Sequence, residues 1–475
     1  PMVQRNRNLS LCFRDARQRL CAKEYRLKRM ETGKMHGTLG WVGIIRIGLI
    51  QLALGSIVVL TTSTLNRVMV VELALPAMLP GALVGLHYAI QVLRPRWGYG
   101  SDVGGRRTPW IIGGMLVLAA GGILAAYATA LMASNPIMGI TIAVLAFIII
   151  GCGVGASGTS LLVFMAVSVS KQRRAAAASI VWLMMIAGIA ITAGIAGKML
   201  DPFSFERLIL VTSTVCTIAV IITIASLWRL ERTSVIIQNE RSEKITGSGF
   251  LVAIRTVWSE PKARKFSIFV FASMLAYSAQ DLVLEPFAGA VFNMTPGEST
   301  QLSGVQHGGV FAGMVLVALL GSGVARGRFG SMRAWTVGGC LASAAAHCSL
   351  VVAGSIGPPF PLTPAVFLLG VANGTFAVAA IGAMMGLVQS GAEKREGTRM
   401  GLWGAAQALA FGLGGFIGTV ILDLVRYLSG SPEMAFAAVF ALEALLFIVS
   451  ARLALGVSED LRNKSLGSNQ EAAIG

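Results

Sequence analysis

The chain has little charge for its length. Only 13% of its 475 residues are Asp, Glu, Lys or Arg, whereas soluble domains carry about 25%. Hydrophobic residues make up 55% of the chain, and the mean hydropathy is +0.72. The shortage of charge argues against a soluble enzyme or binding module. The composition instead predicts an all-α, polytopic membrane protein.

Acidic residues are especially scarce. There are 22 Asp and Glu against 39 Lys and Arg, which gives a formal net charge of +17. On a soluble face, such an excess would suggest nucleic acid. The basic residues here lie mainly outside the apolar runs, in the N-terminal segment and in the connections on one side of the predicted spans, so we expect no nucleic-acid partner. We expect them to set the membrane topology and to contact anionic lipids.

Cysteine and histidine are also rare. The six cysteines show no paired spacing, and four of them lie inside apolar runs, so we expect neither a disulfide framework nor a metal site. The first forty residues are polar and basic and lack the apolar core of a secretory signal, so we expect no such signal.

Long apolar runs account for most of the sequence. Runs of about 20 residues can cross a bilayer as helices. We predict twelve spans, near 41–64, 76–95, 109–131, 137–168, 175–199, 207–229, 265–290, 303–324, 334–353, 362–389, 400–425 and 434–455. The expected domains are a basic N-terminal segment (1–40), a six-helix bundle (41–229), a linker (230–264), a second six-helix bundle (265–455) and a tail (456–475).

The basic residues predict the orientation. If the N-terminus is cytoplasmic, 34 of the 39 Lys and Arg fall on the cytoplasmic side, and four fall on the opposite side. The remaining one, Arg46, lies near the start of the first span and is expected to reach the cytoplasmic surface. The positive-inside rule therefore predicts cytoplasmic N- and C-termini.

One connection carries a motif. Residues 94–110 read "RPRWGYGSDVGGRRTPW" and contain the pattern G-x-x-x-D-x-x-G-R-R, formed by Gly98, Asp102, Gly105, Arg106 and Arg107. Its position between the second and third spans, and its spacing, resemble the signature loop of the major facilitator superfamily, which latches the two six-helix halves together. A second copy, "GVARGRFGSM" from Gly323, lacks the aspartate. The resemblance implies two pseudo-symmetric halves.

Four further stretches narrow the resemblance. They are "TSTLNRVMVVELALPA" (62–77), "GGRRTPWIIGG" (104–114), "QDLVLEPFAG" (280–289) and "SGVQHGG" (303–309). In these stretches, and through nearly all twelve spans, the chain resembles the bacteriochlorophyll-delivery (PucC/LhaA) branch of the superfamily, and the second stretch is most similar to the LhaA type.

This resemblance implies a membrane assembly factor rather than an enzyme. Such a protein would bind bacteriochlorophyll, and carotenoid as a possible second ligand, in the bacterial inner (intracytoplasmic) membrane. Its expected partners are light-harvesting antenna polypeptides and the reaction-center complex, because the LhaA type is associated with assembly of the core antenna.

Polar residues cluster around two of the predicted spans. Charges inside spans are costly and mark candidate functional sites. We place Asp281 near the periplasmic end of the seventh span, too far from Arg46 to pair with it. The pseudo-symmetry of the first and seventh spans predicts a periplasmic polar cluster of Asn66, Arg67, Glu72, Gln280, Asp281 and Glu285. A closing ion-pair network and a contact for a pigment or antenna segment are both open readings.

Histidine is a common axial ligand of chlorophyll magnesium. His87 lies in the middle of the second span, and His307 is expected to open the eighth span beside Gly308 and Gly309, which would let a flat macrocycle approach. Both are candidate pigment ligands, although a buried structural histidine is the common alternative.

The alternative function is an ion-coupled transporter of a small amphiphile. That reading rests on the fold, which does not determine function. The cores of the fourth and tenth spans contain no acidic or basic residue, and this absence favours the assembly factor.

Overall fold

The computed structural model describes residues 39–94, 106–170, 172–233, 258–259, 261–320, 332–389 and 396–474. Within these ranges the chain is helical, as the composition predicts. The signature-loop residues Gly98, Asp102 and Gly105 lie outside the described residues, as do the second copy at 323–331 and nearly all of the N-terminal segment.

The first half begins with one continuous helical segment, α2 (Trp41–Val59), η1 (Leu60–Thr64), α3 (Leu65–Arg67) and η2 (Val68–Glu72), which we call the first span. It continues with α4 (Met78–Ile90), η3 (Gln91–Leu93), α6 (Thr108–Met132), α7 (Pro136–Ser168), α8 (Arg174–Leu200), α9 (Phe205–Leu227) and α10 (Leu230–Thr233). The second half comprises α12 (Pro261–Phe292), α13 (Pro296–Leu320), α14 (Met332–Ile356), α15 (Leu362–Gln389), α16 (Glu396–Ser429) and α17 (Pro432–Ile474).

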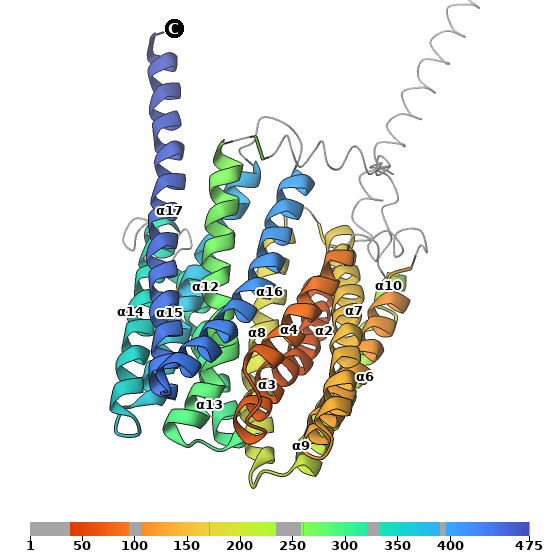
Figure 1. Cartoon of the computed structure of the whole chain (residues 1–475). Helices are drawn as coiled ribbons and strands as arrows, with labels where there is room; N and C mark the ends of the chain where they lie inside the picture. The colour runs from red at the N-terminus through yellow and green to blue at the C-terminus, as the bar shows by residue number, and fades with distance from the viewer. Residues whose placement is uncertain are drawn as a thin grey trace, which may run out of the picture.

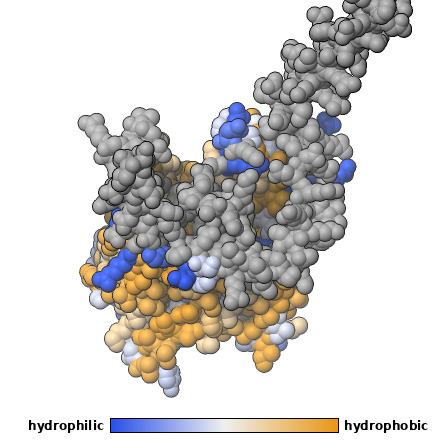
Figure 2. Space-filling model, turned by 90° about the horizontal axis from the view of Figure 1, so that it is seen from above, coloured by the Kyte–Doolittle hydropathy of each residue, from blue (hydrophilic) through white to orange (hydrophobic). Residues whose placement is uncertain are grey.

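Eleven of the described helices are long and apolar enough to cross a membrane. They match eleven of the twelve predicted spans. The remaining predicted span is the second one, near 76–95. It corresponds to α4, an apolar helix of 13 residues, and a turn of 3-10 helix follows it before this described range ends at Arg94. Apolar side chains cover much of the visible flank of the described bundle (Figure 2), as a surface in contact with lipid requires.

Two predicted boundaries are wrong in the same direction. The first span continues to Glu72 instead of ending at residue 64, and α13 begins at Pro296 instead of residue 303. At both boundaries, polar residues that would end an isolated span lie against the other half of the protein. The seventh span ends close to the predicted residue, at Phe292, but Asp281 lies about 16 Å from that end, well inside the helix rather than near its boundary.

Small residues allow the helices to approach closely. A Cβ at Gly151 of α7 would lie 2.8 Å from the carbonyl oxygen of His87 in α4, and one at Gly188 of α8 would lie 2.5 Å from that of Leu52. In the run "GVGASG" (153–158) of α7, a Cβ at Gly153 would lie 2.4 Å from the backbone nitrogen of Leu118 in α6. This close packing is the usual role of glycine ladders inside membrane spans.

The two halves meet along a seam, which we define as three helix contacts: the first span with α12, α4 with α16, and α8 with α13. In Figure 1, α14, α15 and α17 of the second half stand on the left and α6, α7 and α9 of the first half on the right, with the seam helices between them. Each half has a hydrophobic core of its own.

Candidate functional site at the seam

Hydrogen bonds that join the two halves gather at one end of the seam among the described residues. We call it the closed end; it carries the connections at 73–77, 201–204 and 293–295 and lies at the bottom of Figure 1. Thr64 and Thr300 share a hydrogen bond of 3.2 Å, and Thr295 donates to Asp201 at 3.0 Å. The closed end is therefore held by polar contacts between helices that are far apart in sequence.

Asp423 of α16 also joins the two halves, through hydrogen bonds to residues that lie more than 340 positions earlier in the sequence. Its two carboxylate oxygens accept hydrogen bonds from the backbone N–H groups of Ala77, at 3.0 Å, and Met78, at 2.7 Å. These N–H groups lie at the start of α4, where helix geometry leaves them without partners and favours negative charge. An acidic side chain of the second half thus caps a helix of the first.

Arg67 is a buried arginine of the closed end that contacts both halves of the protein. Its side chain is only 2% exposed, and its Nη1 pairs with Glu72 Oε1 at 2.5 Å. Its Nη2 donates to the backbone carbonyl of Met294, in the second half, at 2.7 Å. The guanidinium lies against Gly289, where a Cβ would come within 2.8 Å of it. One arginine therefore joins an ion pair in the first half to the turn after α12.

Asn66 and Glu285 complete this contact. Asn66 donates to the carbonyl of Leu282 at 2.6 Å. Glu285 is 1% exposed and accepts hydrogen bonds from Ser63, at 2.7 Å, and Thr300, at 3.4 Å. The structure therefore places four of the six predicted cluster residues, Asn66, Arg67, Glu72 and Glu285, at the closed end.

The other two members of the predicted cluster lie elsewhere. Gln280 is turned into the second half, where its Oε1 accepts a hydrogen bond from Asn373 of α15 at 2.9 Å. Asp281 lies one helical turn before Glu285 and interacts electrostatically with Glu443 of α17. The predicted cluster thus divides into a seam group and an interior group.

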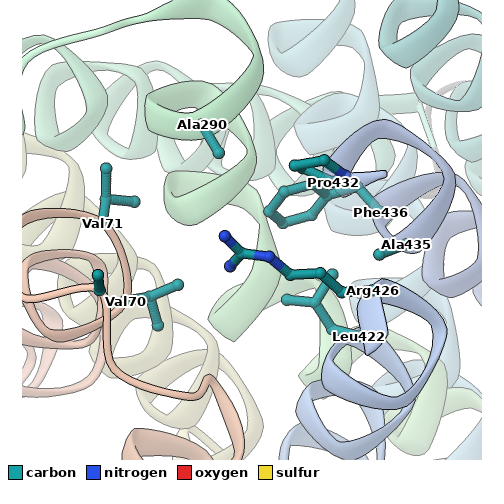
Figure 3. A pocket seen from close by; sticks show the side chains of 9 residues that line it. Val70, Val71, Ala290, Leu422, Arg426, Pro432, Ala435 and Phe436 are labelled. Atoms are coloured by element: carbon teal, nitrogen blue, oxygen red, sulfur yellow. The ribbon is translucent and has the colours of Figure 1, made fainter. Parts of the chain in front are cut away.

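A small cavity opens at the closed end. It has a volume of about 110 Å³ and is lined by apolar residues of the first span, α12, α16 and α17, together with Arg426. The guanidinium of Arg426 points into it between Val70, Val71 and Ala290 (Figure 3). This cavity has room for a small polar group but not for a macrocycle.

His87 is buried in the first half, with 1% of its surface exposed. Its Nε2 lies 3.0 Å from Nε2 of Gln91, one turn further along the chain, and its backbone carbonyl packs against Gly151. The ring therefore already has a hydrogen-bonding neighbour inside a tight helix contact.

His307 does not open α13, as expected from the sequence, but lies eleven residues after Pro296. Its Nδ1 lies 2.9 Å from the carbonyl oxygen of Ser303. Since a carbonyl only accepts, Nδ1 carries the proton and the lone pair is on Nε2. His307 follows Thr300 by seven residues, so it shares the helix face that contacts the seam.

The sequence reasoning missed a buried ion pair. Nε2 of His347 in α14 lies 3.0 Å from Oε2 of Glu443 in α17, and the two side chains are 0% and 1% exposed. Glu443 lies in the apolar run "FALEALLF", so the cost of an intramembrane charge would have identified it as a candidate.

At the opposite end of the first half, the side chains of Arg46 and Glu231 contact helix ends. Arg46 donates to the carbonyls of Ser226, at 2.9 Å, and Trp228, at 2.5 Å, which is how its charge is accommodated. Arg106 is exposed and Arg107 is buried. The N–H groups of Arg107 and Thr108 donate to Glu231 at 2.7 and 3.1 Å. The described end of the signature loop is thereby tied to α10.

A larger hollow of about 890 Å³ lies between α14 and α15. Small residues line the α14 wall, among them Gly338, Gly339 and Ala342, and Leu368 on the α15 wall is 62% exposed. The lining is almost entirely apolar. Such a surface accommodates an apolar ligand or helix rather than a soluble solute.

This arrangement of helices is similar to that of solved transporters with the major facilitator fold. The nucleoside transporter NupG aligns with a TM-score of 0.66 at 12% identity, covering 87% of this chain and 99% of its own. A D-xylose–proton symporter aligns with a TM-score of 0.62 at 15% identity, covering 86% and 97%. At these identities the likeness shows the fold alone.

Within that class, the chain belongs to the PUCC protein family, whose model matches residues 64–461. It is 53% identical over 420 residues to the "Bacteriochlorophyll synthase 44.5 kDa chain" of Rhodobacter capsulatus, covering 88% of this chain and 96% of that protein. It is 27% identical to "Protein PucC" of the same organism, covering 87% and 91%. The predicted family and fold are confirmed.

Proposed function

We propose that this protein is an assembly factor of the bacterial inner membrane that binds bacteriochlorophyll and delivers it to light-harvesting antenna polypeptides. Its partners would be the antenna polypeptides of the core complex and the photosynthetic reaction center, with carotenoid as a second possible ligand. Membership of the PUCC family and the name of the relative at 53% identity support a role connected with bacteriochlorophyll. The cytoplasmic placement of both termini is part of the proposal and rests on the distribution of Lys and Arg.

The observation that carries the proposal is the geometry of His307. A histidine that binds a metal through one ring nitrogen commonly donates its other N–H to a backbone carbonyl, which fixes the tautomer and the ring orientation. Nδ1 of His307 makes such a contact with Ser303. A Cβ at the adjacent Gly308 would meet no atom within 4 Å. The backbone at the neighbouring position is therefore open, while the His307 side chain itself is buried, with 8% of its surface exposed.

Phe311 follows His307 by one helical turn and is 38% exposed, so an aromatic face lies beside the candidate ligand. In the proposed complex, the magnesium of the pigment would accept the Nε2 lone pair and the Phe311 ring would lie beside the macrocycle. His87 and His347 fit less well, because their Nε2 atoms already face Gln91 and Glu443.

The apolar groove between α14 and α15 agrees with a protein whose ligands are pigments and membrane helices. We propose no enzymatic activity, although the word "synthase" is part of the name of one relative.

The test is pigment loading of the purified protein. Bacteriochlorophyll is added in mild detergent, unbound pigment is removed, and the absorption spectrum of the retained pigment is recorded for the wild type, His307→Ala and His87→Ala. We expect His307→Ala to lose most of the bound pigment and His87→Ala to keep it. Equal loading of all three would refute the ligand assignment, and a wild type that retains no pigment would refute the proposed function.

The second candidate function is an ion-coupled transporter of a small amphiphile. The buried acids of the second half favour it, because intramembrane carboxyl groups are characteristic of proton relays. Uptake of a labelled amphiphile that depends on a proton gradient, in vesicles free of antenna polypeptides, would support this function over assembly.

A further inference from the structure

The cavity at the closed end contains an arginine that the proposed function does not use. Arg426 lies in the last turn of α16, and its guanidinium points into the cavity between Val70, Val71 and Ala290 (Figure 3). It is the only polar side chain among the nine described residues that line this space of about 110 Å³. None of them belongs to α13, so the cavity is separate from the candidate pigment ligand His307.

The guanidinium of Arg426 has no partner within the part of the chain that the structure describes. An arginine in the last turn of a helix commonly donates to the final carbonyl groups, but this guanidinium makes no such hydrogen bond and forms no ion pair with a described acid. Arg426 is exposed as a residue, so a ligand can reach it from outside the protein. The cavity therefore offers an accessible positive charge that is unpaired among the described residues.

Three acids at the closed end already have other partners. Glu72 pairs with Arg67 at 2.5 Å. Asp423, one turn before the cavity arginine, accepts hydrogen bonds from the backbone N–H groups at the start of α4. Glu433 accepts a hydrogen bond of 2.6 Å from Ser431. A counter-charge for the cavity arginine would therefore come from a ligand rather than from these acids.

The chemistry of a guanidinium limits the ligand to a small class. Its N–H groups form a planar fork that matches two oxygens of a phosphate or carboxylate group. All the other lining side chains are apolar, so they offer no hydrogen bonds to a neutral polar ligand. The small volume admits one such anionic group, and the rest of a larger ligand has to lie outside the cavity.

The residues beside the cavity are those of a membrane surface. Tyr427 and Leu428, which follow Arg426, are 86% and 73% exposed, and Met434 at the start of α17 is 53% exposed. The membrane-spanning part of α16 ends at Ser429, and tyrosines are enriched where such helices reach the lipid headgroups. The cavity therefore lies at the level of the phosphate groups of one leaflet, next to exposed apolar side chains that can contact acyl chains.

We propose that this cavity binds the phosphate group of a membrane phospholipid. The guanidinium of Arg426 donates hydrogen bonds to the phosphate oxygens, and the acyl chains lie outside, against the exposed apolar side chains of α16 and α17. The cavity walls come from both halves of the protein, Val70 and Val71 from the first and Leu422 and Phe436 from the second. The bound lipid therefore contacts both halves at the closed end.

The experiment is native mass spectrometry of the delipidated full chain in neutral detergent, with phosphatidylglycerol, diacylglycerol of the same acyl chains, and inorganic phosphate as probes. We expect the wild type to bind phosphatidylglycerol more tightly than diacylglycerol, and Arg426→Gln to lower that affinity about ten-fold or more, because hydrogen bonds to a charged group are lost. Equal binding of diacylglycerol would show that the phosphate is not recognised. Displacement of the lipid by inorganic phosphate at the same concentration would identify a site for a free anion. Either result would overturn the proposal.

Two further variants test the position of the site. Arg452→Gln removes an exposed arginine of α17 away from the closed end and should leave the affinity unchanged; a loss equal to that of Arg426→Gln would mean general attraction of lipid to basic residues and would overturn the proposal. Ala290→Leu keeps the guanidinium but fills the space in front of it, and should also weaken binding. Wild-type affinity in Ala290→Leu would place the lipid outside the cavity, and the proposal would be wrong.

Discussion

The two halves of the protein share a fold but bury charged side chains of opposite sign. The buried or nearly buried charges of the first half are arginines, Arg67 and Arg107. The side chains of Arg67 and Arg46 donate to backbone carbonyls at a turn and at a helix end. The buried acids among the described residues, Glu285 and Glu443, belong to the second half. Within the same fold, the buried charges are therefore arginines in the first half and glutamates in the second.

The largest expected effect comes from breaking the buried pair of the second half. His347→Ala leaves Glu443 without its partner, and removal of one member of a buried ion pair typically costs about 3–5 kcal/mol. Thermal unfolding in detergent would measure this loss. The matched variant of the first half, His87→Ala, leaves only a neutral amide unpaired and should cost about 1–3 kcal/mol. Equal losses would remove the distinction between the halves.

The next largest loss of stability is expected for Arg67, the arginine that connects the two halves. Arg67→Ala removes the contacts with Glu72 and Met294, and hydrogen bonds to charged groups contribute about 1.5–3 kcal/mol. We expect a lower melting temperature and faster labelling of a cysteine introduced at Thr295. Arg452→Ala is the control, because Arg452 is exposed and lies twenty residues after the start of α17, away from the closed end, so its loss should change neither readout. A wild-type labelling rate in Arg67→Ala would show that the closed end does not depend on this residue.

A smaller effect is expected within the first half alone. Glu231→Ala leaves the N–H groups of Arg107 and Thr108 at the start of α6 without an acceptor, and loss of a helix N-cap costs about 0.5–2 kcal/mol. Glu231→Gln retains an acceptor oxygen and should lose less. Chemical unfolding monitored by tryptophan fluorescence would rank the three proteins, and an equal loss in both variants would contradict the capping role.

The smallest effect is expected at an exposed acid of the second half. Glu433 lies at the start of α17, and Glu433→Gln should change stability by no more than about 0.5 kcal/mol. The same melting experiment measures it. A loss as large as that of His347→Ala would show that any acid on α17 matters, and not Glu443 in particular.

The sequence predicts the fold well because twenty-residue apolar runs are a direct consequence of the thickness of the bilayer. It predicts the ends of the spans poorly. The first span continues past Asn66 and Arg67 because α12 and the turn after it supply the hydrogen-bond partners of these residues, and those partners lie more than 200 positions away. Local polarity alone therefore ends the predicted helix too early.

The candidate site shows the same limit. The cost of intramembrane charge identified Asp281 and Glu285, and it would also have identified Glu443. The partner of Glu443 could not be predicted, because His347 lies 96 positions earlier and only the packing of α14 against α17 brings them together. Nor could periodicity show that Gln280 turns into the second half while Glu285 faces the seam.

The most direct test of the central claim is the absorption spectrum of the protein purified in mild detergent from its native membrane, with its co-purifying polypeptides identified. The proposed function predicts bound bacteriochlorophyll together with antenna or reaction-center subunits, and a clear loss of pigment in His307→Ala. A colourless protein without photosynthetic partners would contradict it and would favour the ion-coupled transporter.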